Sequence, residues 1–217
     1  SILSLFFIFL SLFFLFLFTW DYLVERISVC GGLADYLAEF ITQFNYIPYL
    51  GEALMAVLFV VFQRACALSI GRSEWYALSF IAPVLMLVYM NDIYVMLCYL
   101  LALIIAVLLC ALYRRHPGLL WAGIATMLGY WLIGPAIFVF TVFAALKERN
   151  WNSLILIAAA VLTVYASKWT YLQQYPWKTL AFGVNYYRHA LVVPPMQLVI
   201  AAMTFIIPVL SDLLPKP

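Results

Sequence analysis

Charged residues are scarce in this chain. Only 9% of its 217 residues are Asp, Glu, Lys or Arg, whereas 68% are hydrophobic and the mean hydropathy is +1.09. A soluble domain carries about 25% charged residues, so this chain could not cover its surface with polar groups in water. Its net charge is only +2, and the basic residues lie in short loops rather than in the basic patch of a nucleic-acid-binding protein. We therefore expect an integral membrane protein that contacts membrane lipids and no nucleic acid.

Cysteines are also few, and their spacing is not that of a metal site. Cys66, Cys98 and Cys110 lie inside apolar runs, and only Cys30 lies in a polar loop, so we expect no disulfide framework. The sequence lacks a phosphate-binding glycine loop, a nucleophile elbow and an HExxH motif. These absences argue against the common soluble enzyme classes.

Long apolar runs dominate the rest of the sequence. In a bilayer such runs predict helices, because backbone polar groups there must be hydrogen-bonded within the segment. We expect spans at residues 2–19, 48–70, 75–90, 93–113, 152–168 and 195–212. No small-residue cleavage site follows residues 2–19, so we expect an uncleaved first span and not a signal peptide. We predict an all-α fold in which residues 1–217 form a single membrane domain, the ordered part of a longer chain.

Residues 119–146 are apolar for longer than the roughly 20 residues that one crossing needs. Glycines and a proline stand near the middle, at 129–135, so the segment is either one long kinked helix or two short helices. Cytoplasmic loops collect Lys and Arg, and only two short helices place Lys147 on the same side as the basic loops 71–74 and 114–118. We favour two short helices. The fold then has about eight transmembrane or half-membrane helices, with the first loop on the outer face.

Residues 20–47 form the longest stretch that is not uniformly apolar. Four acidic residues and one arginine lie in it: Asp21, Glu25, Asp35, Glu39 and Arg26. Apolar side chains recur at helical spacing on one side, at Leu33, Tyr36, Leu37, Phe40, Ile41 and Phe44. Asp35, Glu39 and Gln43 share the opposite side. Helices on a membrane surface are usually basic, because anionic lipids attract Lys and Arg. We therefore predict an amphipathic surface helix whose acidic side faces a protein cavity or a metal ion.

Two acidic residues lie at predicted outer helix ends. Asp21 follows the first span, and Asp92 lies in the turn between the third and fourth spans. If the two carboxylates are close, they could hold a divalent cation such as Mg²⁺ or Mn²⁺, or act as a base and a cation ligand. Acidic residues are also ordinary in turns, so the site depends on the distance between the two carboxylates.

Two further charged residues lie in the second span. A carboxylate at Glu52, one turn from the start, costs on the order of a few kcal/mol unless it is paired or hydrated. The helix dipole also favours an acid there. Arg64 lies deeper and could extend its guanidinium to the interface. A shared water-filled path beside Glu52 and Arg64 would favour a transporter.

A second outer segment, residues 169–193, is rich in aromatic side chains. Aromatic belts at membrane interfaces account for such a composition. The functional alternative is a wall that binds substrate, in which Trp177 and Tyr186 stack on a sugar and Lys178 or Arg188 binds a lipid phosphate.

The run FTWDYLVERISVCGGLADYLAEFITQFNYIPYLGEAL, residues 18–54, resembles the start of a bacterial family of polytopic membrane proteins of unknown function. In that family a Gly-Gly pair precedes an amphipathic helix, and the second span opens on Pro. The likeness covers residues 15–60 closely and the rest loosely. It implies a polytopic protein of the bacterial inner membrane and no particular activity.

A broader likeness is to the GT-C superfamily, the integral-membrane glycosyltransferases that use polyprenyl-phosphate sugars. Those proteins have an acid soon after the first span, amphipathic helices in the first outer loop, and a second acid in the outer turn between the third and fourth spans. A basic inner loop then leads into a Gly-rich pair of short helices. The matching features are Asp21 or Glu25, residues 33–44, Asp92, and RRHPGLLWAGIATMLGYWLIGP at 114–135. The resemblance implies that Asp21 is the base or a metal ligand, with Glu25 as its alternative, and that Asp92 is a second ligand.

The chain departs from the GT-C pattern at two places. GT-C enzymes often have paired acids in the first loop, whereas Asp21 has no acidic neighbour. Tyr130 and Trp131 stand where a Lys or Arg commonly follows the Gly-rich half of the helix pair. Our leading hypothesis is a GT-C-like glycosyltransferase, or a relative, acting on a lipid-linked sugar at the outer face. The alternative is a non-catalytic subunit that scaffolds a complex with other membrane subunits.

Overall fold

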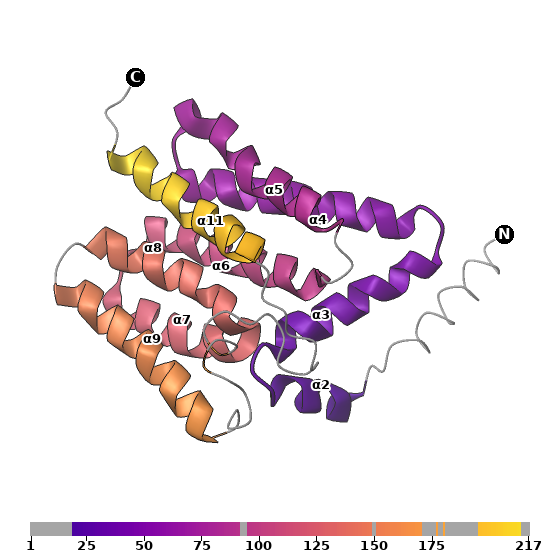
Figure 1. The fold of residues 1–217 in the computed structure, drawn as a ribbon, viewed down its shortest axis with the longest axis horizontal. Helices are drawn as coiled ribbons and strands as arrows, with labels where there is room; N and C mark the ends of the chain where they lie inside the picture. The colour runs from indigo at the N-terminus through magenta and orange to yellow at the C-terminus, as the bar shows by residue number, and fades with distance from the viewer. Residues whose placement is uncertain are drawn as a thin grey trace.

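The computed structural model describes residues 19–91, 95–148, 151–170, 177, 180 and 195–213. All regular secondary structure within those residues is helical (Figure 1). The predicted all-α class is therefore confirmed for this part of the chain. The predicted first span, residues 2–19, lies outside it except for Thr19.

Two helices follow Thr19 and are joined by a tight turn. α2 (Trp20–Ile27) begins where the Thr19 hydroxyl accepts a hydrogen bond from the Tyr22 amide at 3.3 Å. α3 (Gly32–Thr42) passes directly into the 3₁₀ helix η1 (Gln43–Tyr46). The Thr19 hydroxyl thus accepts a hydrogen bond from one of the backbone amides that the start of a helix leaves without a partner.

α3 packs on the rest of the protein through small side chains. Ala34 and Ala38 are 3% and 6% exposed, whereas Tyr36 and Phe40 remain partly exposed. The helix lies against α6 and α7. The predicted amphipathic helix is thus packed on the bundle, most closely through its alanines, while Leu37 and Ile41 of its bulky apolar side also contact the core.

The next three elements form a hairpin, in which one long helix is followed by two shorter helices that run antiparallel to it. α4 (Leu50–Ile70) ends at Gly71, whose φ of +68° is the left-handed conformation that glycine adopts without steric cost. The 3₁₀ helix η2 (Ser73–Phe80) and α5 (Ile81–Tyr89) then run back along α4. The predicted third span, residues 75–90, is therefore part 3₁₀ and part α-helix.

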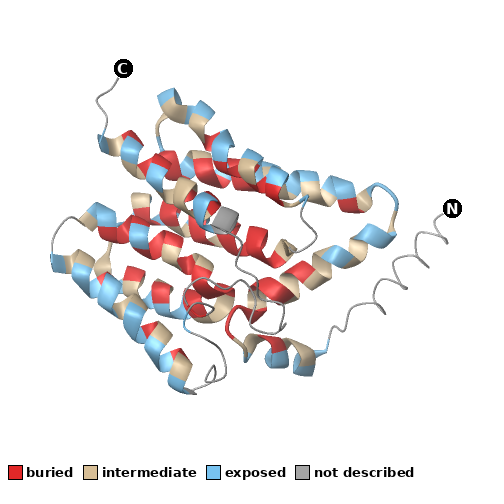
Figure 2. Cartoon of the chain, viewed as in Figure 1, coloured by how far each residue is buried: buried red, intermediate tan, exposed pale blue. Residues whose placement is uncertain are grey.

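α6 (Leu97–Arg115) lies at the centre of the fold. Leu100, Leu103 and Val107 have no exposed surface, and 67% of the most apolar part of this helix is buried. Figure 2 shows the buried residues concentrated along α6 and on the sides of its neighbours that face it. The core is thus built around one helix that α3, α4 and α8 contact.

Residues 119–148 fold back on themselves. α7 (Leu119–Ile133) ends at Gly134, which has a φ of +74°, and the 3₁₀ helix η3 (Gly134–Ile137) leads into α8 (Phe138–Glu148). The rings of Trp121 and Phe140 lie 5.6 Å apart, and the hydroxyls of Thr126 and Thr141 lie 3.0 Å apart. A straight helix would separate residues 121 and 140 by about 28 Å at 1.5 Å per residue. The prediction of two short helices is therefore confirmed.

The C-terminal ends of four helices meet at one end of the fold. Arg114 of α6 donates to the carbonyl oxygen of Ile70 in α4 and pairs with Asp212 of α11 (Pro195–Leu213) at 2.6 Å. Lys147 of α8 pairs with the same Asp212. This placement of Lys147 beside the loops after α4 and α6 agrees with the charge-based prediction.

Among the residues that the structure describes, four stretches are long and apolar enough to cross a membrane: Leu50–Ile70, Leu97–Arg115, Leu119–Glu148 and Trp151–Trp169. The third is the folded-back pair α7 and α8, and the fourth is most of α9 (Trp151–Thr170). Only 33% of the most apolar part of α4 and 22% of that of α9 is buried. Exposed apolar helix faces of this kind suit a protein surrounded by lipid.

Candidate functional site

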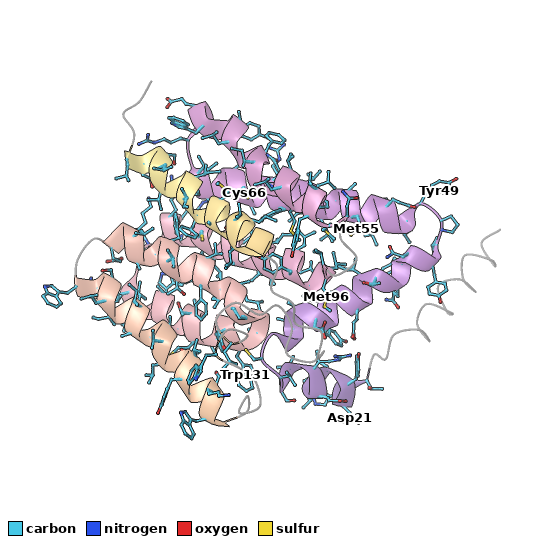
Figure 3. The ribbon with its side chains drawn as sticks, viewed as in Figure 1. Asp21, Tyr49, Met55, Cys66, Met96 and Trp131 are labelled. Atoms are coloured by element: carbon cyan, nitrogen blue, oxygen red, sulfur yellow. The ribbon has the colours of Figure 1, made fainter. Side chains whose placement is uncertain are left out.

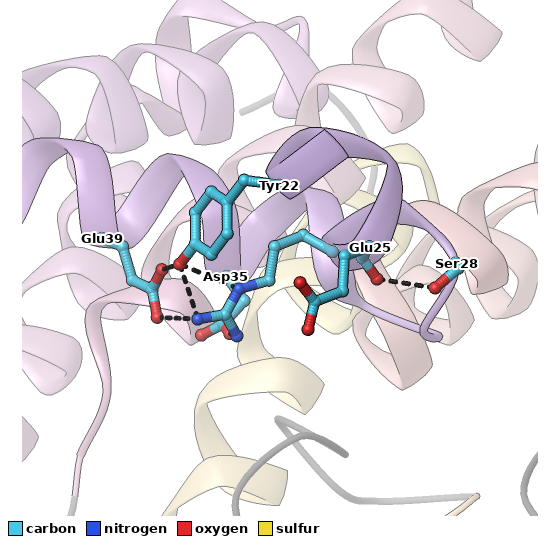
Figure 4. Close-up of polar contacts among 6 residues, drawn as sticks. Tyr22, Glu25, Ser28, Asp35 and Glu39 are labelled. Carbon is cyan, nitrogen blue, oxygen red and sulfur yellow. Dashed lines mark hydrogen bonds and ion pairs between the residues drawn. The ribbon is translucent and has the colours of Figure 1, made fainter. Parts of the chain in front are cut away.

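An ion-pair cluster joins α2 to α3 (Figure 4). The Arg26 guanidinium donates to Asp35 at 3.0 Å and to Glu39 at 2.6 Å. The same guanidinium donates to the Tyr22 hydroxyl at 3.0 and 2.7 Å, and Tyr22 in turn donates to Glu39. Arg26 and Asp35 are only 7% and 6% exposed, whereas Tyr22 and Glu39 are partly exposed, so the Arg26–Asp35 pair is the part of the cluster that is shielded from water.

Protonation in this cluster follows from its contacts. Burial alone would lower the pKa of Arg26, but Tyr22 and the two carboxylates raise it, so the guanidinium stays charged. Burial, followed by the hydrogen bond to Glu39, raises the pKa of Tyr22, which keeps its hydroxyl protonated. The acidic side of α3 was predicted to face a cavity or a metal ion. It faces Arg26, which corrects that prediction.

The turn between α2 and α3 docks on the tip of the α7–α8 hairpin, about one hundred residues further along the chain. The Gly31 amide donates to the Trp131 carbonyl at 2.8 Å, and the Trp131 indole donates to the Ile27 carbonyl at 2.8 Å. The Cys30 thiol contacts the Tyr130 carbonyl at 2.8 Å. The Trp131 carbonyl lies in the last turn of α7, where carbonyl oxygens lack a partner within the helix, whereas the Tyr130 carbonyl also accepts a hydrogen bond from the Gly134 amide.

Two glycines make this docking possible. Gly31 has a φ of +79°, and a Cβ there would lie 3.7 Å from the Gly134 Cα. A Cβ on Gly32 would collide with the carbonyl group of Arg26 and lie 2.6 Å from its carbon. The Gly-Gly pair noted in the sequence thus has two separate roles, a left-handed turn and a close backbone contact.

We expect Cys30 to resist alkylation in the folded protein. Its side chain is 2% exposed, and burial raises the pKa of its thiol above the usual 9.0. The reactive thiolate therefore does not form at pH 9, where a free thiol would be half ionised. A variant that keeps Cys30 as its sole cysteine should react with N-ethylmaleimide at pH 9 at least about tenfold more slowly in mild detergent than in SDS. Equal rates would contradict the docked turn.

A groove of about 840 Å³ lies between α4 and the η2–α5 segment. Its walls are stripes of side chains at three- and four-residue spacing, namely Glu52, Met55, Ala56, Phe59, Val60 and Gln63 facing Phe80, Pro83, Val84 and Leu87. From Glu52 to Gln63 the α4 wall rises about 16 Å, roughly half of a 30 Å hydrocarbon core. The groove is long enough to hold part of a lipid chain.

Polar groups lie at two points of this groove. Asn45 of η1, Glu52 in the first turn of α4 and Asn91 after α5 line the end nearest to η1. Deeper in, Gln63 is 7% exposed and donates to the Ser79 hydroxyl at 2.8 Å. An apolar groove with convergent polar groups at one end suits an amphiphilic ligand.

The predicted site residues do not all lie together. Asp21 and Glu25 are exposed on α2 and do not line the groove, and α3 separates Asp21 from Met55 on the groove wall in Figure 3. Trp177 is half exposed beside α9, where it stacks on Tyr165 at 6.3 Å. Four further candidates lie outside the described residues: Asp92, Lys178, Tyr186 and Arg188. Among the residues that are described, no group of three or more His, Cys, Asp and Glu could hold a metal ion.

The sequence did not identify Gln63 or Arg26 as candidate site residues, although both make specific polar contacts in the structure. Gln63 is an amide inside an apolar helix, where polar side chains usually bond to a neighbouring helix. That signal could have pointed to the groove. Arg26 was noted only as the single base among four acids, and its burial between Asp35 and Glu39 could have been proposed on charge alone. Glu52, which was noted as unusual, does lie on the groove wall.

Comparison with known proteins gives one match. No curated protein and no solved structure matches the chain. The sequence model of DUF6057, described as a family of unknown function, matches residues 2–217. This agrees with the resemblance to a family of unknown function and leaves the GT-C likeness as a hypothesis. Because the match covers nearly the whole chain, the protein belongs to the DUF6057 family.

Proposed function

We propose that the protein binds a lipid-linked sugar in the groove between α4 and α5 and acts on it as a GT-C-like glycosyltransferase. The groove is the observation that supports this proposal. Its apolar walls suit a polyprenyl chain, and Asn45, Glu52 and Asn91 could hydrogen-bond to the sugar at the polar end. Glu52 is the carboxylate that lines the groove, and we assign it the role of orienting the sugar or accepting the proton of the attacking hydroxyl.

The proposal includes a topology. The polar end of the groove lies beside η1, whereas Arg114 and Lys147 gather at the opposite, C-terminal end of α4. Because basic residues mark the cytoplasmic side, the polar end of the groove would face outward. In this proposal the chain has eight membrane segments in a bacterial inner membrane, with the first loop on the outer face.

A divalent cation, Mg²⁺ or Mn²⁺, held by Asp21 and Asp92 stays a prediction because Asp92 lies outside the described residues. Asp21 is exposed on α2 and does not line the groove. Its position therefore gives the cation site no support, and the proposed chemistry assigns no step to the cation.

Filling the groove tests the binding step. Ala56→Trp should weaken binding of a polyprenyl-phosphate sugar by at least about tenfold, because an indole would occupy the middle of the groove. The matched control is Val57→Trp, since Val57 is 56% exposed and does not line the groove. Binding is measured by retention of the lipid on the purified protein in native mass spectrometry. Equal retention by the two variants would exclude the groove as the lipid site.

A second set of variants, assayed in cells, separates catalysis from binding. In cells, Glu52→Gln, Asp21→Asn and Asp92→Asn are compared with the native protein for lipid-sugar and glycan products at equal protein levels. Unchanged product in all three would remove the catalytic part of the proposal, even if the lipid binds.

A second candidate function is a non-catalytic membrane subunit. The observation that favours it is the pairing of Asp35 and Glu39 with Arg26, which gives two acids of the first loop a structural role. Mass measurement after detergent extraction distinguishes the two, because a subunit would come out in a stoichiometric complex.

A further inference from the structure

A second pocket lies at the basic end of the fold, away from the groove. It has a volume of about 440 Å³ and lies between the C-terminal ends of α4 and α6 and the start of η2. Three arginines line it, Arg72, Arg114 and Arg115, together with Ser73 and Tyr76. No acidic residue lines it within the described part of the chain. The pocket is therefore a concentrated positive site at the end of two apolar helices.

Arg114 is held in place by the protein itself. It donates to the Ile70 carbonyl and to Asp212, while its Nε is buried without a hydrogen-bond partner among the described residues. A Cβ on Gly71 would lie 2.9 Å from the Arg114 Cδ, so a larger residue at position 71 would clash with the arginine side chain. Arg114 thus forms a fixed wall of the pocket. Its positive charge is already offset by the ion pair with Asp212.

Arg72 and Arg115 contribute the other two guanidinium groups of the pocket. Arg115 is exposed, and Arg72 is partly exposed at the start of η2. The ends of α4 and α6 expose backbone carbonyls, whose partial negative charge attracts arginine but repels an anion. The three guanidiniums reverse that local potential. Guanidinium groups bind phosphate oxygens with matched geometry.

We propose that this pocket binds the phosphate of an anionic phospholipid in the leaflet on the basic side of the membrane. A lipid is favoured over free phosphate because Ala67, Leu68 and Ala111 form an apolar side of the same pocket. Leu68 is 48% exposed, so an acyl chain can continue along α4 from a headgroup bound at the arginines. Basic pockets between membrane helices suit acidic headgroups.

The experiment compares the double variant Arg72→Gln, Arg115→Gln with the native protein. Phosphatidylglycerol, phosphatidylcholine and inorganic phosphate are added separately to the purified protein, and binding is followed by native mass spectrometry. Each basic residue near an anionic lipid contributes about fivefold in affinity, so the double variant should bind phosphatidylglycerol about 25-fold more weakly. Binding of phosphatidylcholine should not change.

Arg64→Gln is the matched control, because it removes one positive charge from exposed α4 surface that does not line the pocket. It should change phosphatidylglycerol binding by less than about twofold. If the double variant does not fold, Arg115→Gln alone should still weaken binding about fivefold. Three results would overturn the proposal: an equal loss in Arg64→Gln, equal binding of the two lipids by the native protein, or competition by inorganic phosphate without any preference for phosphatidylglycerol.

Discussion

Replacing Arg26 with methionine should lower the free energy of unfolding by about 3–5 kcal/mol. The substitution leaves Asp35, 6% exposed, and the largely shielded Glu39 without their shared cation. An uncompensated carboxylate in such surroundings must become protonated or draw in water, and either change weakens the contact between α2 and α3. Equilibrium unfolding in mixed micelles with increasing SDS measures the loss.

A compensated variant separates charge from shape. Arg26→Met combined with Asp35→Leu and Glu39→Leu removes all three charges, and its stability should return to within about 1–2 kcal/mol of the native protein. A triple variant as unstable as Arg26→Met alone would show that packing by the arginine stem, rather than the buried charges, holds α2 against α3.

Gly32→Ala should have an effect of similar size, about 4 kcal/mol or more. The added methyl group would collide with the backbone carbonyl of Arg26, and backbone atoms cannot move aside as a side chain can. The turn must therefore open, which separates Arg26 from Asp35 and lifts Gly31 from Trp131. The same SDS unfolding experiment measures the loss.

Gly123→Ala is the matched control for that substitution. Gly123 lies in α7, and a Cβ there would meet no atom within 4 Å. Alanine in a helix interior is favoured over glycine by about 0.5–1 kcal/mol, so this variant should be slightly more stable than the native protein. If both variants lost stability equally, the effect would not come from the contact with Arg26.

The helix positions could be predicted well from apolar runs. Expected spans at 48–70, 152–168 and 195–212 correspond closely to α4, α9 and α11. Charge counting also predicted the α7–α8 hairpin, because basic residues prefer one side of a membrane. These features depend on local composition, which the sequence displays directly.

The side of α3 that packs most closely on the bundle was not predicted from the sequence, and the lipid environment explains why small residues lie there. In water the bulky apolar side of a helix is buried, but lipid is as apolar as leucine and does not drive that burial. Close helix contacts then use small residues, and Ala34 and Ala38 provide them. Their four-residue spacing was visible in the sequence.

The groove and the docking of the first turn could not be predicted from the sequence. The groove needs the relative position of α4 and α5, which no periodicity supplies. The contact of Gly31 with Trp131 is a hydrogen bond between two backbone groups. Every residue type except proline has both backbone groups, so the amino-acid sequence does not indicate which of them will pair. The Gly31–Gly32 pair was the one sequence feature consistent with a close backbone contact at this turn.

The distance along the chain between the first turn and the hairpin tip has a consequence for biosynthesis. Cys30 and Tyr130 are separated by 100 residues, which a ribosome takes about 5–20 s to translate at 5–20 residues per second. Throughout that interval the turn has no surface on which to dock. The partners of Arg26 are only 9 and 13 residues away, so they emerge almost at once. We therefore expect the ion pairs of Arg26 with Asp35 and Glu39 to form first during synthesis. The turn between α2 and α3 would dock only after the α7–α8 hairpin has been translated.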